Sequence, residues 1–96
     1  MVEIVWLPKA IERLQTIHTF YLLRSKKSAN LLKKDIIATA KLLHKHPEIG
    51  SIEPNLSDLP ICFRSLIVRN NYKVIYYISD KIVYIATIWD CRQENR

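Results

Sequence analysis

The fold is decided by residues 62–89, which run CFRSLIVRNNYKVIYYISDKIVYIATIW. Apolar side chains recur here at about every second position, a spacing that is typical of half-buried β-strands. Asn70–Asn71 predicts a tight hairpin turn, because asparagine tolerates the left-handed backbone of such turns, and Ser79–Lys81 predicts a second one. The segment is therefore expected to form an antiparallel three-stranded meander, with strands at Cys62–Arg69, Tyr72–Ile78 and Ile82–Trp89.

Upstream of this segment, the apolar spacing changes to that of helices. A short β-branched stretch, Val2–Trp6, predicts a first strand, and Pro8 suits the first turn of a helix that ends near Arg24. A second helix is expected to start with Ser25 or Ser28 as its N-cap and to end before Pro47, and residues 50–60 are expected to form a loop. The order β-α-α-β-β-β predicts a single α+β domain over residues 1–96, with a helical hairpin packed on one face of an antiparallel sheet.

Strand parity predicts which side chains share a face of this sheet. A two-residue turn at Asn70–Asn71, with no bulge in the strands, pairs Arg69 with Tyr72 and Arg64 with Tyr77. The larger and more apolar face is expected to pack against the helices, and it holds Phe63, Ile67, Tyr72, Val74, Tyr76 and Ile78. The open face then holds Arg64, Leu66, Val68, Lys73, Ile75, Tyr77, Ile82, Tyr84, Ala86 and Ile88, followed by Asp90 and Arg92 just past the last strand.

The predicted open face is basic and aromatic. A formal net charge of +6 favours a polyanionic partner, either nucleic acid or an acidic protein segment. Cations on a sheet surface can hold phosphates while rings between them stack bases. The candidate target-binding residues are Arg64, Arg69, Lys73, Tyr77, Tyr84 and Arg92. An alternative is that these side chains only solvate an exposed sheet face.

The residue types exclude several other classes of protein. Gly50 is the single glycine, which rules out a Gly-rich phosphate loop. Cys62 and Cys91 do not make a disulfide framework, no secretory leader is recognisable, and no apolar run approaches the roughly 20 residues of a membrane span. We expect a cytoplasmic protein with reduced thiols and no membrane contact. His44 and His46 are more typical of a solvated helix end than of ligands, so no metal and no cofactor are expected.

The whole chain resembles the RelE/ParE superfamily of bacterial toxins from type II toxin–antitoxin operons. The run Arg64–Tyr77 is similar to the family's arginine-rich strand, short turn and Tyr-Arg-x-x-Tyr strand. The run Ile85–Gln93 is similar to its last strand and the arginine that closes it. The opening Trp6–Ala10 and the helix stop His46–Gly50 also suit the family's pattern.

The resemblance implies one of two activities. RelE-like members cleave mRNA in the ribosomal A site, whereas ParE-like members bind DNA gyrase and trap it on DNA. For the nuclease, the resemblance implies Arg64, Lys73 and Arg92 as catalytic residues that grip the scissile phosphate. For both activities it implies a cognate antitoxin, which wraps the toxin with an acidic, partly disordered segment, and a pair that binds operator DNA through the antitoxin.

The sequence departs from the ribonuclease pattern at several positions. Leu66 falls where a second basic residue is common, Asp90 falls where histidine or glycine is frequent, and no tyrosine follows Arg92. The remaining cations can stabilise charge but are poor general bases at neutral pH. We therefore predict a toxin that is more ParE-like than RelE-like. The alternatives are an mRNA endonuclease and a degenerate toxin that serves only as antitoxin partner and co-repressor.

Overall fold

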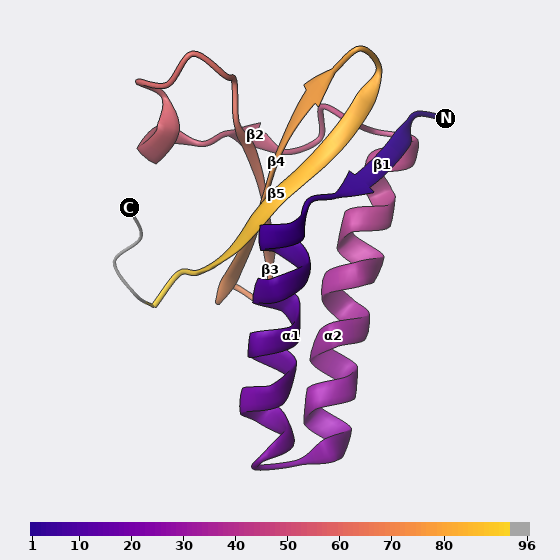
Figure 1. Cartoon of the computed structure of the whole chain (residues 1–96), viewed down its shortest axis with the longest axis vertical. Helices are drawn as coiled ribbons and strands as arrows, with labels where there is room; N and C mark the ends of the chain where they lie inside the picture. The colour runs from indigo at the N-terminus through magenta and orange to yellow at the C-terminus, as the bar shows by residue number, and fades with distance from the viewer. Residues whose placement is uncertain (93–96) are drawn as a thin grey trace.

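The elements of the fold follow one another in the predicted order. The computed structural model describes residues 1–92, and Gln93 of the quoted ending lies outside them. The main elements are β1 (Glu3–Trp6), α1 (Pro8–Leu22), α2 (Lys26–Lys41), β3 (Arg64–Val68), β4 (Tyr72–Ser79) and β5 (Ile82–Asp90). Three short elements connect α2 to β3, namely the 3-10 turns η1 (Leu42–His44) and η2 (Pro54–Leu56) and the strand β2 (Ser51–Ile52). Figure 1 shows that the two helices extend well past the end of the sheet.

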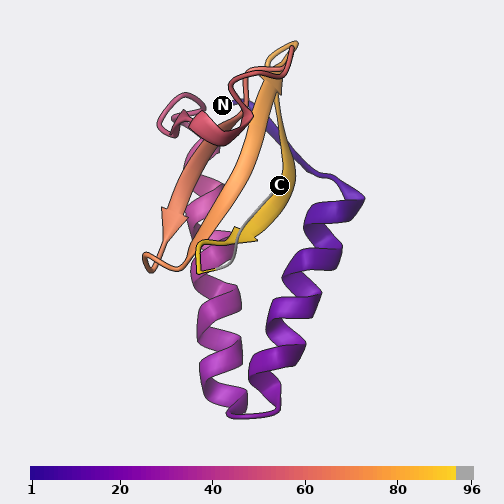
Figure 2. The same cartoon turned by 90° about the vertical axis from the view of Figure 1, so that its left-hand side faces the viewer.

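The five strands form one mixed sheet in the order β1-β5-β4-β3-β2. The predicted α+β fold, with its antiparallel meander of β3, β4 and β5, is confirmed. The one difference is that β1 pairs with β5 in parallel, so the sheet is mixed and not antiparallel throughout. The reason is that the chain reverses four times between these strands: between the helices, between α2 and β3, and at the two hairpins (Figure 2). An even number of reversals returns β5 to the direction of β1.

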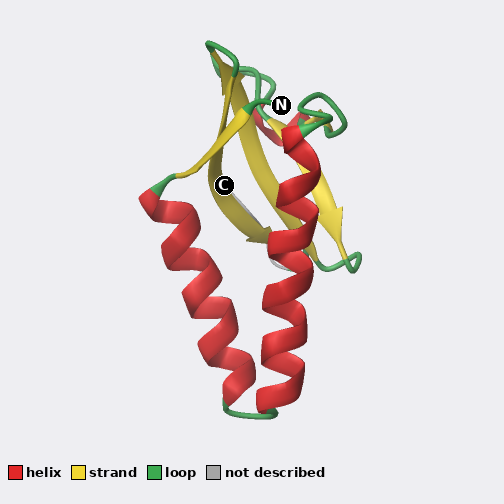
Figure 3. Cartoon of the chain, turned by 90° about the vertical axis from the view of Figure 1, so that its right-hand side faces the viewer, coloured by secondary structure: helices red, strands yellow, loops and turns green. Residues whose placement is uncertain are grey.

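Local sequence signals start both helices. Pro8 occupies the first turn of α1, where its missing N–H costs nothing. Ser25 is the N-cap of α2, and its hydroxyl accepts a hydrogen bond from the amide of Ser28 at 3.2 Å, which satisfies one of the free amides of the first turn. The helices lie side by side and antiparallel (Figure 3).

The core lies between the helical hairpin and one face of the sheet. Ala10 and Leu14 of α1 and Ile36 of α2 are buried against the central strands. The phenol of the buried Tyr76 closes one end of this core, because its hydroxyl donates to the carbonyl of Pro47 at 2.8 Å and accepts from the amide of Gly50 at 2.9 Å. The strand residues of the core are Val68, Tyr72, Val74, Tyr76, Val83, Ile85 and Ile88.

The predicted parity of β3 is wrong by one residue. Val68 pairs with Tyr72, so the turn contains three residues instead of two, and Arg69 and Asn70 are the ones with positive φ, at 54° and 61°. Because a one-residue slip exchanges the faces of a strand, Arg64, Leu66 and Val68 lie on the helix side. Ile67 lies on the open face, where it is 60% exposed.

A bulge changes the parity of β5. Ile75 pairs with Thr87 and Tyr76 with Ile85, so Ala86 is the extra residue. Tyr84 keeps its predicted place on the open face opposite Tyr77, but the residues after Ala86 exchange faces. Thr87 and Trp89 therefore join the open face, whereas Ile88, Asp90 and the following Arg92 turn toward the helices.

Candidate functional site

Arg64 does not lie on the open face where the sequence analysis placed it. Its guanidinium donates from Nη1 to the carbonyl of Gly50 at 2.7 Å and to that of Glu48 at 3.3 Å. These contacts hold the chain that follows η1 against the start of β3. The side chain thus has a clear structural role in closing this loop.

Lys73 does lie on the open face, where it is bound to an acid from the connecting segment. Its Nζ is 2.7 Å from Oε1 of Glu53, whose side chain is fully buried. Glu53 also accepts hydrogen bonds from the hydroxyl of Ser65 and the amide of Asn55, both at 3.0 Å. Burial raises the pKa of Glu53, but these three bonds outweigh it and hold the pKa below its ordinary value. The carboxylate therefore stays charged and ties the segment around η2 to the sheet.

Arg69 sits in the turn between β3 and β4, and its side chain points toward α2 and not to the open face. Its Nε and Nη2 each lie 2.7 Å from Oδ2 of Asp35 on α2. The pair is about half exposed, so its contribution to stability is small. It fixes the turn on the helix side of the sheet.

The two predicted aromatic residues meet on the open face. The rings of Tyr77 and Tyr84 stack with their centroids 5.2 Å apart, and Phe63 meets Tyr77 edge to face at 5.6 Å. Three rings in a row offer a surface for stacking or for a protein contact. Of the predicted cations, Lys73 is the one that shares this face.

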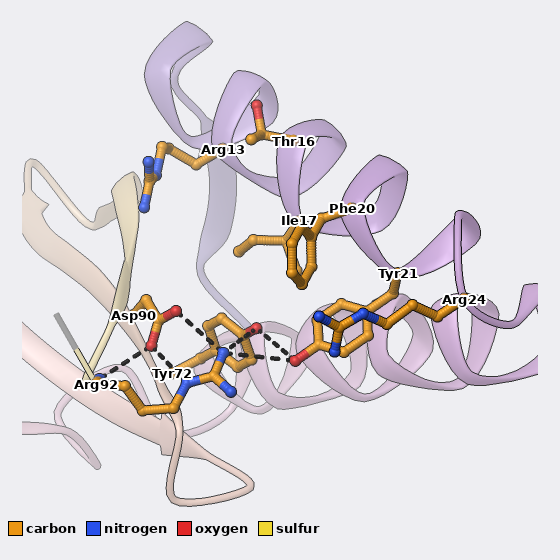
Figure 4. Close-up of a pocket in the computed structure, with 9 residues that line it drawn as sticks. All are labelled: Arg13, Thr16, Ile17, Phe20, Tyr21, Arg24, Tyr72, Asp90 and Arg92. Carbon is orange, nitrogen blue, oxygen red and sulfur yellow. Dashed lines mark hydrogen bonds and ion pairs between the residues drawn. The ribbon is translucent and has the colours of Figure 1, made fainter.

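Arg92 lies in a pocket on the helix side, between α1, the start of β4 and the end of β5 (Figure 4). Its Nε and Nη2 donate to the two carboxylate oxygens of Asp90 at 3.0 Å each, and Nη2 also donates to the hydroxyl of Tyr72 at 3.0 Å. The guanidinium lies 5.5 Å from the centre of the Tyr72 ring. The pocket encloses about 410 Å³ and is lined by Arg13, Thr16, Ile17, Phe20, Tyr21, Arg24, Tyr72, Asp90 and Arg92.

The two phenols of this pocket have pKa values that move in opposite directions. The hydroxyl of Tyr72 donates to that of Tyr21 at 3.2 Å, and Arg92 lies 3.4 Å from Tyr21. Those two donors lower the pKa of Tyr21. Burial, together with its donation to Tyr21, raises the pKa of Tyr72 to about 12. Tyr72 is therefore a stable donor at neutral pH, and Tyr21 is the phenol of the pair better suited to accept.

The pocket is suited to an anionic group with an apolar or aromatic part. It contains three arginines and one aspartate, and the hydrogen bond from Arg92 lowers the pKa of Asp90 and keeps it charged. Arg24 lies over the ring of Phe20 at 4.8 Å, and Phe20 is 50% exposed. The side chain of Arg24 forms no ion pair within residues 1–92, which leaves its charge available to a partner.

The sequence analysis missed most of this pocket. In the sequence, Tyr21 continues the helical spacing of the apolar residues Ala10, Leu14 and Ile17, and strand parity predicts Tyr72 on the face against the helices. Both rings do pack against the core. Tyrosine is amphipathic, however, and its hydroxyl usually finds a polar partner at the edge of a core. The one feature of the sequence that could have indicated this pocket is the hydroxyl of Tyr21, which ends an apolar stripe three residues before Arg24.

Two further predictions concern the histidines and the membrane. The Nδ1 atom of His44 lies 2.8 Å from the carbonyl oxygen of Val2, and His18 bonds to Asn30 at 2.8 Å. No group of three or more histidine, cysteine or acidic residues in positions 1–92 is arranged to hold a metal ion. Neither of the helices within these positions is both long and apolar enough to cross a membrane.

Residues 4–95 match the family described as the ParE toxin of the type II toxin–antitoxin system parDE. The chain belongs to this family, so it is a toxin of the RelE/ParE superfamily. A toxin of such a pair has a cognate antitoxin as its partner. The ParE-like prediction agrees with this family membership.

Solved structures share the fold. A chain of the chromosomal ParDE TA system from P. aeruginosa is 23% identical, with a TM-score of 0.78 over 94% of this chain and 96% of that one. A chain of the YoeB dimer from Staphylococcus aureus is 21% identical, with a TM-score of 0.58 over 90% and 92% of the two chains. No curated protein matches the sequence.

Proposed function

We propose that this toxin arrests bacterial growth by acting on DNA gyrase in the cytoplasm, and that its antitoxin neutralises it. The observation that carries the proposal is the separation of the three cations proposed for RNA cleavage. Arg64 donates hydrogen bonds to loop carbonyls, and Lys73 forms an ion pair with the buried Glu53 on the open face. Arg92 lies on the helix side, next to α1. Cleavage of a phosphodiester needs such groups to converge on one phosphate.

The pocket around Arg92 is the proposed contact surface for the target. Arg92 and Arg24 are exposed there beside the ring of Phe20, which suits a protein partner that brings a carboxylate and an apolar side chain. Of the other candidates, Tyr77 and Tyr84 form a second, half-buried aromatic surface on the opposite side of the sheet. The net charge of +6 suits an acidic antitoxin segment, and we propose that operator DNA is bound through that antitoxin.

A supercoiling assay tests the gyrase target directly. Purified toxin is added to gyrase and relaxed plasmid, and the products are run with and without detergent to reveal trapped cleavage complexes. We expect loss of supercoiling or accumulation of linear DNA at micromolar toxin. Unaffected gyrase, from a preparation that arrests growth when expressed without antitoxin, would reject the target.

A second candidate function is favoured by one observation, the hydrogen-bonded group of Tyr21, Tyr72 and Arg92. The guanidinium can stabilise charge, and the donors around Tyr21 lower the pKa of that phenol, which favours the ionised form that accepts a proton; these are two requirements of RNA cleavage. Cell-free translation of a reporter, with mapping of mRNA 5′ ends, tests it. Cuts aligned with codons would establish the nuclease, and a Tyr21→Phe variant should then lose them.

Growth assays connect the pocket to toxicity. Arg92→Ala is expected to abolish growth arrest, Arg92→Lys to retain part of it, and the exposed Lys9→Ala on α1 to leave it unchanged. Circular dichroism on each purified variant checks that the fold is kept. Full toxicity of Arg92→Ala would indicate that the target binds the Tyr77–Tyr84 side of the sheet instead. Absence of toxicity in the unaltered protein would favour the alternative of a degenerate toxin that acts only as antitoxin partner and co-repressor.

A further inference from the structure

The outer side of α2 carries a row of lysines that neither the core nor the Arg92 pocket uses. Lys27, Lys34 and Lys41 are spaced by seven residues, and Lys26 and Lys33 repeat the same spacing beside them. Because seven residues are close to two helical turns, such a repeat keeps its members on one side of the helix. We call these five residues the lysine row.

The lysine row is exposed and has no internal partner. All five residues are exposed, and none of their ammonium groups forms an ion pair or hydrogen bond within residues 1–92. The one acid of α2, Asp35, is held by Arg69 and so does not neutralise the row. Lys33, Lys34 and Lys41 instead border a shallow depression of about 360 Å³, together with Asn30, Ile37 and Ala38.

The composition of the row distinguishes among possible anionic partners. Protein interfaces are enriched in arginine and aromatic residues and depleted in lysine, whereas this surface contains lysine alone among the charged residues and no aromatic ring. Single-stranded nucleic acid needs aromatic rings on which its bases stack. Compact ammonium charges on a straight helix suit the phosphates of a duplex, because the bases of a duplex are already paired and stacked and need no aromatic side chains.

The dimensions of the row also suit a duplex. From Lys27 to Lys41 the helix rises by about 21 Å, at about 1.5 Å per residue. Double-stranded DNA advances by about 3.4 Å per base pair, so the row spans about six base pairs. We propose that the outer side of α2 binds the sugar–phosphate backbone of duplex DNA without reading its sequence. The choice of DNA over duplex RNA rests on the proposed gyrase function, whereas the binding of a duplex does not.

Fluorescence anisotropy with a labelled duplex of about 20 base pairs tests this, over a salt series from about 50 to 200 mM. The Lys34→Gln/Lys41→Gln double variant is expected to bind about tenfold more weakly at the lowest salt, and to lower the slope of log affinity against log salt by about two. The matched control is Lys9→Gln/Lys81→Gln, which removes the same charge from exposed positions outside α2 and should keep the slope. A Lys34→Arg/Lys41→Arg variant should retain binding.

Four outcomes would overturn the proposal, and a fifth separates it from the gyrase target. Equal weakening by the row variant and the control would mean that binding depends on net charge alone. Absence of duplex binding at the lowest salt, or tighter binding of duplex RNA, would reject the ligand. Loss of polyglutamate binding in the row variant with duplex binding intact would assign the row to an acidic protein segment. A negative gyrase assay combined with the expected slopes would reject the gyrase target and leave duplex binding by the row established.

Discussion

Replacement of Lys73 by methionine should destabilise the toxin by about 2–3 kcal/mol at neutral pH. The substitution keeps an unbranched apolar side chain of similar length but leaves the fully buried carboxylate of Glu53 without its cation. Removing one partner of a buried ion pair typically costs about 3–5 kcal/mol, because a charge is left uncompensated. The cost here falls at or below the lower end, because Ser65 and Asn55 still donate to Glu53 and because the Lys73 side chain is 23% exposed.

Replacement of the other partner of this ion pair, Glu53, should cost less. Glu53→Gln removes the charge, keeps the size of the side chain and leaves Lys73 with partial access to water, so we expect about 1 kcal/mol. The Lys73→Met/Glu53→Gln double variant should then be more stable than the sum of the two single changes predicts, by about 1–2 kcal/mol. Urea unfolding of the four proteins, with Lys9→Met as an exposed control, measures these differences.

The pH dependence identifies the carboxylate as the cause. The folded-state pKa of Glu53 lies below its ordinary value, so its stabilising contribution is present above the unfolded pKa of about 4 and is lost as the pH falls through the folded pKa. In Lys73→Met the buried carboxylate can be protonated, which removes the penalty. The difference between the variant and the unaltered protein should therefore shrink as the pH falls towards the lowered folded-state pKa of Glu53, because without Lys73 the carboxylate takes up its proton at a higher pH. A loss under about 1 kcal/mol at neutral pH, or one independent of pH, would refute the reasoning.

Substitutions at three other positions test the fold at single atoms. Gly50→Ala should destabilise by about 2–3 kcal/mol in urea unfolding, because its Cβ would lie 2.6 Å from the hydroxyl oxygen of Tyr76; a neutral result would show that this contact can relax. Tyr76→Phe should cost about 1–3 kcal/mol in thermal unfolding, because it leaves the amide of Gly50 and the carbonyl of Pro47 without that hydroxyl. Ser25→Ala should cost about 1 kcal/mol and Ser25→Asp much less, and equal losses would mean that the α2 cap contributes nothing.

The predicted face of β3 was wrong because its sequence is apolar on both sides. Leu66, Ile67 and Val68 follow one another, so alternation does not say which of them faces the core. The structure chooses the register in which Val68 is buried and Arg69 bonds to Asp35 on α2. That long-range contact stabilises a left-handed backbone at Arg69. Arginine is not a typical turn residue, so the local sequence does not predict a turn there.

The Arg92 pocket illustrates the same limit at the level of the site. Arg92 was recognised as a candidate, but the bulge at Ala86 moves it from the open face to the helix side. A bulge leaves little trace in an apolar strand such as Ile85–Ile88, because every register buries apolar side chains. The residues that surround Arg92, above all Tyr21 and Arg24 on α1, are its neighbours only because of that single extra residue.

The sequence by itself determined the element order and the helix starts, because these depend on periodicities, caps and turn residues that act over a few neighbouring positions. Its motifs also carried the resemblance to the toxin family, which the match over residues 4–95 confirms. It also determined which functional groups are available, namely an excess of cationic side chains with tyrosines among them. Only the tertiary structure decided where that chemistry is placed. It bound Lys73 to Glu53, turned Arg64 to the loop and set Arg92 against α1, since strand register and bulges are chosen by contacts between distant segments.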